Sequence, residues 1–175
     1  MRSVATLGLL AACLDLTPRL AAQATSARAL GESALYSLYV KRHAMTVEFA
    51  ELATARRSDG EVRKAAEKLA QAHREAGEKL ERAAQERHLT LALPERDTSV
   101  VLLAQARKAL EGKSEQAFDA TWSALAYDWL STLVLDNNRT VKPNLDPALK
   151  SIAEAHTTWL FHQMSDMDKL RKKFK

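Results

Sequence analysis

Histidines are the residues of this 175-residue chain that could most directly do chemistry, and there are five of them. An imidazole serves as a general acid or base near neutral pH and is a common metal ligand. His73 stands out because it lies in "KLAQAHREAGEKL" (68–80), at a position where the apolar seam of a helix would carry leucine or alanine. It is a metal ligand, a catalytic base or a buried polar group, and the spacing of its neighbours separates these alternatives.

A di-iron centre is the metal site to consider first in a helical protein. It takes a glutamate from each of two helices and a Glu-x-x-His from each of the other two. The chain contains no Glu-x-x-His: the residue three before His73 is an alanine, and the one three before His162 is a tryptophan. A looser site from His73, His162 and a carboxylate is the remaining metal alternative. We expect neither a metal nor another cofactor, and we interpret His73 and His162 as polar core residues.

The other residue types that support catalysis give no further site. His43 lies on a partly apolar helix face and is expected to be half-buried, while His156 and His162 flank Trp159 and cannot both point fully into a core. The only cysteine is Cys13, and the chain has neither a serine in a strand-to-helix elbow nor a glycine-rich phosphate loop. We therefore expect no catalytic residues and no enzyme activity.

The charges indicate solvated helix faces rather than a nucleic-acid site. The chain carries 26 lysines and arginines against 22 aspartates and glutamates, a net charge of +4, and the two signs are interleaved. A nucleic-acid footprint would gather basic residues on one face. We expect no nucleic-acid partner.

The first 24 residues are predicted to be a signal peptide. Arg2 precedes an apolar run from Val4 to Leu14, which is shorter than the about 20 residues that span a membrane. The small-x-small site Ala22-Gln23-Ala24 suits cleavage after Ala24. The mature protein is therefore expected to be exported.

A second processing route overlaps the first. The segment "LAAC" (10–13) looks like a bacterial lipobox, whose cysteine is lipidated and becomes N-terminal, so Cys13 is the alternative lipid-attachment residue. Cleavage after Ala24 predicts a periplasmic protein, whereas lipidation predicts a protein tethered to the outer membrane through Cys13. Neither form could make an internal disulfide, because no other cysteine is present.

The rest of the chain is predicted to be one helical domain, 32–175, after a short linker, 25–31. Few glycines and prolines favour helix, and clear breakers separate helices at about 32–57, 61–88, 99–111, 115–137 and from the Asp146-Pro147 pair to about Lys172. The second has the clearest apolar seam, with steps of four and three residues: Val62, Ala66, Leu69, His73, Ala76, Leu80 and Ala83. Four long helices and one short helix predict an all-α bundle, with the short helix in a long crossover and "NNRTVKPNLDP" (137–147) as a polar connection.

Two segments resemble a known family. "VEFAELATARRSDGEVRKAAEKLAQAHREAGEKLERAA" (47–84) is similar to the first helical pair of the family called domain of unknown function 4142. "EQAFDATW" (115–122) and "DPALKSIAEAHTTWLFHQMSDMDKL" (146–170) are similar to its last two helices. The resemblance covers about 33–170. It implies a ferritin-like four-helix bundle in an exported bacterial protein, of a kind often labelled an outer-membrane protein.

The polar core positions of that family are only partly kept in this chain. Its histidines in the second and last helices fall on His73 and His162. Where the family has glutamate in the first helix this chain has Thr46, and where it has histidine in the third long helix this chain has Leu130. The loss of two of four polar positions argues against a shared site built from all of them.

The function expected from these features is that of a periplasmic or membrane-tethered binding or stress-related protein. It would act through its surface or through a small pocket between helices, and the residues do not define the ligand. Two alternatives stay open: a ferritin-like metal-binding protein, and a self-assembling structural protein of the envelope, which would be a homo-oligomer.

Overall fold

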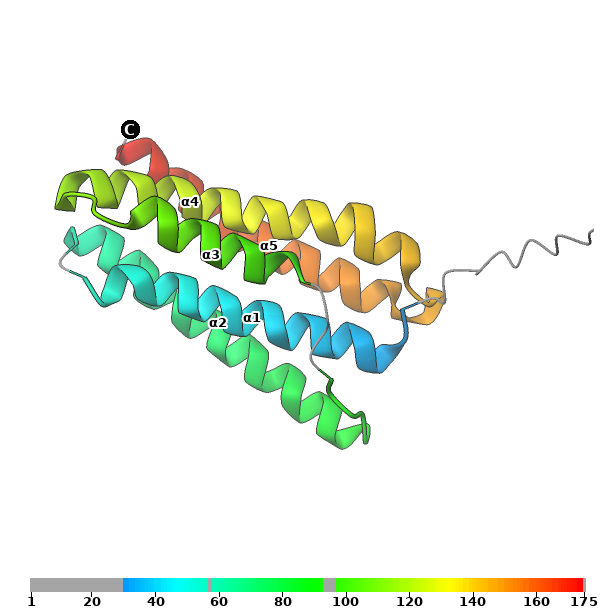
Figure 1. The fold of residues 1–175 in the computed structure, drawn as a ribbon. Helices are drawn as coiled ribbons and strands as arrows, with labels where there is room; N and C mark the ends of the chain where they lie inside the picture. The colour runs from blue at the N-terminus through cyan, green and yellow to red at the C-terminus, as the bar shows by residue number, and fades with distance from the viewer. Residues whose placement is uncertain (1–29, 57, 93–96, 175) are drawn as a thin grey trace, which may run out of the picture.

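The computed structural model describes residues 30–56, 58–92 and 97–174. Within these ranges the chain is helical and forms no strand. Four long helices lie side by side and a shorter one runs along them (Figure 1). The all-α prediction is confirmed. The predicted signal peptide, Cys13 and most of the linker 25–31 lie outside the described residues.

The helices have the following bounds: α1 (Glu32–Thr54), α2 (Gly60–Glu86), α3 (Thr98–Leu110), α4 (Glu115–Asp136) and α5 (Lys150–Lys173). Three short turns join the last two: the π-helical η1 (Asn137–Val141) and the 3-10 turns η2 (Lys142–Asn144) and η3 (Pro147–Leu149). The segment 137–147 connects α4 to α5 as predicted, and most of its residues are exposed or half-buried. Asn137, Val141 and Leu145 are buried, because these turns close one end of the bundle.

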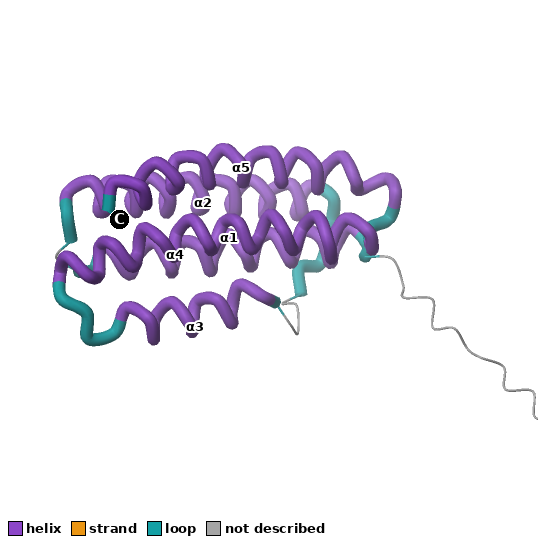
Figure 2. The backbone as a smooth tube through the Cα atoms, turned by 90° about the horizontal axis from the view of Figure 1, so that it is seen from above, coloured by secondary structure: helices purple, strands orange, loops and turns teal. Residues whose placement is uncertain are grey.

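The order of the helices in space includes one long crossover. α1, α3 and α5 run in one direction and α2 and α4 in the other (Figure 1). The segment that contains α3 returns the chain along the bundle, and α3 packs on α1 and α4, on the side away from α2 and α5 (Figure 2). One long crossover is the connectivity of ferritin-like folds. A relationship to ferritins stays a prediction.

Local capping signals begin and end the helices close to where the sequence predicts. Oδ1 of Asp59 accepts a hydrogen bond from the backbone N–H of Glu61 at 2.8 Å and caps α2. Oδ1 of Asp146 accepts from the N–H of Ala148 at 2.9 Å, one turn before α5. Gly112 follows α3 with φ of +68°, a conformation that glycine adopts without strain. Each aspartate cap typically contributes about 1 kcal/mol.

The buried apolar residues form two clusters. In the larger one, Phe49 of α1 stacks against Trp122 and Trp129 of α4, with ring centroids 5.5 and 4.9 Å apart. The smaller one, near η1 and η3, contains Leu35, Tyr39, Val141, Leu145, Leu149 and Ala153. The α4 residues predicted to be in the core, Phe118, Trp122, Trp129 and Leu133, are buried, and Leu125 is partly buried.

The apolar seam of α2 begins as predicted and then moves by one residue. The buried residues of α2 are Val62, Ala66, Leu69, Ala70, His73, Gly77 and Ala84. A strict seven-residue repeat rotates by about 20° per heptad around a straight helix, so the buried face passes from Ala76 to Gly77. Gly77 also permits a close approach of α2 to α1, since a Cβ at this position would lie 3.4 Å from the Cβ of His43.

Polar residues separate the two apolar clusters on α1 and α5 and contact polar residues of α2 and η1. We call them the polar layer: Arg42, His43 and Thr46 on α1, His73 on α2, Asn137 at the end of α4, and His156 and Thr157 on α5. On α1, for example, the layer follows Tyr39 of the smaller cluster and precedes Phe49 of the larger one. Because a buried polar group must be hydrogen-bonded or costs stability, the partners of these residues decide what the layer does.

Candidate functional site

Two imidazoles from neighbouring helices meet inside the polar layer. Nδ1 of His43 on α1 and Nδ1 of His73 on α2 lie 3.0 Å apart, within hydrogen-bond distance. The two residues are only 2% and 1% exposed. His73 therefore points into the bundle, as the seam predicted, and His43 is fully buried rather than half-buried.

The hydrogen bond constrains how this neutral pair shares its protons. One Nδ1 donates and the other accepts, so one histidine carries its proton on Nδ1 and the other on Nε2. Nε2 of each ring is buried and has no hydrogen-bond partner within the described ranges. The pair thus presents one buried donor and one buried acceptor, each of which costs about 1–3 kcal/mol while unpaired.

His156 and Trp159 of α5 and Tyr39 of α1 surround the histidine pair. The His156 ring stacks on Tyr39 with centroids 3.9 Å apart and meets His43 edge-on at 5.1 Å. The Trp159 ring lies 4.7 Å from His73 and 5.3 Å from His43. We call these five residues the histidine–aromatic cluster.

Burial keeps the three imidazoles of this cluster neutral. Desolvation lowers the pKa of His43 to about 4. Desolvation also lowers the pKa of His73 and of His156 well below the usual value for histidine, and the positive charge that would form on His43 lowers both further. At neutral pH the three rings therefore act as uncharged hydrogen-bonding and stacking groups.

Four of these five residues, all except His73, line a cavity of about 550 Å³ between α1, α2 and α5. Its walls are mainly apolar and aromatic: Ala72, Ala76, Leu80, Ile152 and Ala155 with the rings of Tyr39, His43, His156 and Trp159. Glu75 and Lys79 are exposed and lie at its opening to solvent. Apolar walls with a few convergent polar groups are typical of small-molecule sites.

The structure does not bring together the two histidines that the sequence selected. His73 is buried, but His162 is exposed on α5. The helix buries Leu160, and a residue two positions further is turned by about 200° around the axis. The prediction that His162 is a polar core residue is therefore wrong. His156 is half-buried instead, in agreement with the expectation that His156 and His162 cannot both point fully into a core.

The looser metal site predicted as an alternative has no geometric support. That site required the side chains of His73 and His162 to point toward each other, together with a carboxylate, but His162 is exposed. Within the described ranges, no group of three or more histidine, aspartate or glutamate side chains is arranged to hold a metal ion.

The two positions at which the chain departs from its family's polar pattern take part in packing. Oγ1 of Thr46 accepts a hydrogen bond from Nε1 of Trp129 at 2.9 Å and donates to the carbonyl of Arg42 at 2.8 Å. Leu130 is fully buried in the larger apolar cluster. Both residues therefore fill space that a metal-ligating side chain would need.

A hydrogen-bond network fixes the ring of Tyr39 beside the cavity. Its hydroxyl donates to Oδ1 of Asn137 at 2.7 Å. The amide of Asn137 in turn donates to Oγ1 of Thr157 at 2.5 Å and to the carbonyl of Ala153 at 3.0 Å. Burial raises the pKa of Tyr39 to about 12, so the phenol stays protonated and remains a donor.

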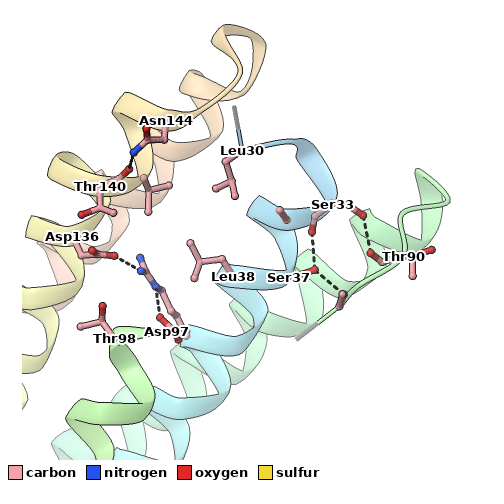
Figure 3. Close-up of a pocket in the computed structure, with 14 residues that line it drawn as sticks. Leu30, Ser33, Ser37, Leu38, Thr90, Asp97, Thr98, Asp136, Thr140 and Asn144 are labelled. Carbon is pink, nitrogen blue, oxygen red and sulfur yellow. Dashed lines mark hydrogen bonds and ion pairs between the residues drawn. The ribbon is translucent and has the colours of Figure 1, made fainter. Parts of the chain in front are cut away.

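A second cavity, of about 560 Å³, lies between the start of α1, the segment that leads into α3, and η1 (Figure 3). Arg42 is 4% exposed and lines it. Its guanidinium pairs with Asp97 just before α3, with Nε and Oδ1 3.2 Å apart, and with Asp136 at the end of α4. The arginine thus joins the crossover to two long helices.

The other polar groups at this second cavity are also paired with one another. Ser37 donates to the carbonyl of Ser33 at 2.7 Å and accepts from the backbone N–H of Ala92 at 3.0 Å, and Ser33 donates to the carbonyl of Thr90 (Figure 3). These bonds hold the crossover against α1. We therefore interpret this cavity as a structural feature and consider the histidine–aromatic cavity as the candidate site.

Tyr39 and the full burial of His43 were not predicted from the sequence. Tyr39, His43 and Thr46 are spaced by four and three residues, which places them on one helix face and signals a polar stripe. The burial of Arg42 was not predicted either. The contacts of Trp159 with His43 and His73 could not be predicted, because these histidines lie on other helices.

The described part of the chain is an all-α helical bundle whose long helices enclose a polar layer and a lateral cavity. A family model described as Domain of unknown function (DUF4142) matches residues 17–170. The chain belongs to this family, which confirms the resemblance and extends it to residue 17, inside the predicted signal peptide. No curated protein and no solved structure matches the chain. None of the helices in the described ranges is long and apolar enough to cross a bilayer.

Proposed function

We propose that this protein is an exported binding protein that holds a small, mostly apolar molecule in the cavity between α1, α2 and α5. The observation that carries the proposal is a cavity of about 550 Å³ beside two buried imidazole nitrogens that lack partners. His43, which supplies one of these nitrogens, also lines the cavity. A bound molecule would cover the apolar walls and the ring faces that line the cavity.

The packing of the helices explains why space exists there. α1 packs closely along α2, and α4 along α5, whereas α2 and α5 touch at few points. α2 also diverges from the other helices toward its C-terminal end (Figure 1). The cavity occupies the gap between these two hairpins, and a ligand would bridge them.

The chemistry of the walls supports binding rather than catalysis. The three histidines are kept neutral by burial. Nucleophilic catalysis needs a serine, cysteine or similar group beside a base, and the cavity lining holds none. In this proposal the imidazole rings that line the cavity contact the ligand and perform no reaction.

Export is supported by the first 24 residues, which have the features of a signal peptide, with Cys13 as the alternative lipid-attachment residue. The intact mass of protein from its native envelope tests this part. Cleavage after Ala24 or a diacylated or triacylated Cys13 is the expected result. A full-length mass that retains Met1 would contradict both routes.

Nuclear magnetic resonance with a panel of neutral, mostly apolar small molecules tests the binding site. Binders should shift the amide signals of Ala72, Ala76 and Ala155 at the cavity walls. Ala76→Phe fills the cavity and should abolish these shifts. The same substitution at Ala104, which is exposed on α3, is the matched control and should leave them unchanged. If no compound shifts the wall residues, the proposed function is wrong.

A further inference from the structure

We infer that the cavity takes an uncharged, planar aromatic molecule, bound with its plane parallel to the ring of His156. This inference rests on the proposed function, because it names the chemistry of the ligand of the same cavity.

The orientation of the wall rings points to a planar ligand. The ring planes of Tyr39 and His156 differ by 22°, and those of His156 and Trp159 by 21°. All three rings line the cavity. The ring of His156 is therefore nearly parallel to both of the other rings that α1 and α5 place in the cavity wall.

The centroid distances show that these parallel rings are unequally spaced. Tyr39 and His156 are in direct contact at 3.9 Å, whereas His156 and Trp159 are 6.0 Å apart. Aromatic rings prefer offset stacking or edge-to-face contact. A planar ligand can stack with an offset on the exposed parts of His156 and Trp159, which are both half-buried, and a bulky saturated ring cannot approach these two rings as closely.

His43 supplies a wall of a different orientation. Its ring lies at 89° to His156 and at 70° to Trp159. A perpendicular ring offers edge-to-face contact to a molecule that is stacked on the parallel rings. The cavity thus combines the two geometries in which aromatic rings attract one another.

The charges around the cavity favour a ligand without net charge. Glu75 and Lys79 bring one negative and one positive group to the opening. The three histidines are neutral at pH 7, because burial lowers the pKa of each. A charged ligand would enter mainly apolar surroundings with no unpaired opposite charge on the inner wall.

Isothermal titration calorimetry with a matched pair of probes tests the inference. At pH 7.5, 2-naphthol and its saturated analogue decahydro-2-naphthol present the same carbon skeleton and hydroxyl group, but only the first is planar and aromatic. We expect 2-naphthol to bind at least about tenfold more tightly, because only it gains ring contacts. Equal affinity for the two probes would overturn the inference.

Substitutions within α5 assign that preference to the cavity. Trp159→Leu should reduce the preference to roughly threefold or less by removing one parallel ring. Phe161→Leu is the control, since Phe161 is on the same helix, 47% exposed and outside the cavity lining, and it should keep the full preference. If Trp159→Leu does not fold, His156→Leu removes another parallel ring and should give the same reduction. An unchanged preference in the folded variant would count against the inference.

The two proposals fail in distinguishable ways. If other small molecules shift the cavity signals but 2-naphthol has no advantage or does not bind, the planar ligand is wrong and the binding function stands. If no compound shifts the cavity signals, the binding function itself is wrong.

Discussion

Nδ1 of His43 and Nδ1 of His73 lie 3.0 Å apart and join α1 to α2 at the level where the two apolar clusters are separated. This contact explains the presence of His73 in the apolar seam of α2. It is a buried, neutral polar group with a defined partner, and its Nε2 is buried without a hydrogen-bond partner among the described residues. Several measurable properties depend on this arrangement.

The free energy of unfolding should fall as the pH drops from 7.5 to 5.0. The folded pKa of His43 is about 4, below the unfolded value of about 6.5, so the unfolded chain binds more protons over this range. His43 alone should lower the stability by about 2 kcal/mol at pH 5.0. His73 and His156 act in the same direction, because their pKa values are also lowered. Urea denaturation at the two pH values measures the loss.

His162→Gln is the control for this measurement. Because His162 is exposed, its replacement should leave the dependence on pH unchanged. A wild-type protein that is equally or more stable at pH 5.0 would contradict the prediction, since it would mean that at least one buried imidazole is stabilised as a cation.

The histidine pair should show a strong coupling in a double-mutant cycle at neutral pH. His73→Leu removes one unpaired nitrogen but leaves His43 with both nitrogens unpaired, so the number of unpaired nitrogens stays the same. We expect the stability to change by no more than about 1 kcal/mol. Replacing both histidines with leucine removes every unpaired nitrogen, and we expect a gain of about 2 kcal/mol. Urea denaturation of the four proteins gives the coupling energy.

A double variant that is less stable than the wild type would show that water already satisfies both Nε2 atoms, or that leucines do not fit the space. Retention of the pH dependence in the double variant would assign it to His156 instead.

Tyr39→Phe should destabilise the bundle by about 1–3 kcal/mol, because it leaves Oδ1 of the buried Asn137 without its donor. Tyr36→Phe is the matched control, since Tyr36 is also buried on α1 but its hydroxyl has no hydrogen-bond partner among the described residues. Thermal unfolding compares the two variants. Ultraviolet titration of the wild type should in addition detect one phenol with a pKa of about 12 rather than 10. Equal losses in both variants would argue that the hydroxyl of Tyr39 contributes nothing specific.

Arg42→Met should cost about 3–5 kcal/mol, because it leaves the carboxylate of Asp97, whose side chain is 1% exposed, without its counter-charge. Hydrogen exchange should increase most in α3, which follows Asp97 directly. Arg107→Met removes another ion pair between α3 and α1, but Arg107 and Glu48 are 57% and 43% exposed, so its cost should stay below about 1 kcal/mol. Similar costs for the two variants would contradict a structural role of the buried pair.

The purified protein should contain well under one transition metal ion per chain after dialysis. His43 and His73 are hydrogen-bonded to each other and His156 is stacked on Tyr39, so these histidines do not form a ready set of three ligands. A closed metal site needs about four ligands. Elemental analysis tests the prediction. Stoichiometric zinc or iron that is lost in His73→Leu would overturn it.

The helix boundaries could be predicted because the signals that set them act within one turn. Asp59 and Asp146 cap the N–H groups of residues two positions further along, and Gly112 supplies a backbone conformation that other residues rarely adopt. The burial of Asn137 within the segment 137–147 could not be predicted, for the opposite reason. Asn137 forms hydrogen bonds to Tyr39 and Thr157 in distant parts of the chain, and these contacts replace the solvent that its composition suggests.

The candidate site could be predicted only in part. The place of His73 between Leu69 and the small residues of α2 determined that its imidazole faces other helices. Its partners could not be read from that pattern, because His43 and His156 come from α1 and α5.

The sequence by itself determined the all-α class, the family, the helix ends and the burial of His73, since periodicity and capping are local properties of the chain. Only the tertiary structure decided that His43 and His156 join His73 while His162 faces solvent. The physical reason is rotational: a shift of two residues turns a side chain by about 200° around a helix. Which side of each helix is buried is set by how α1, α2 and α5 pack together.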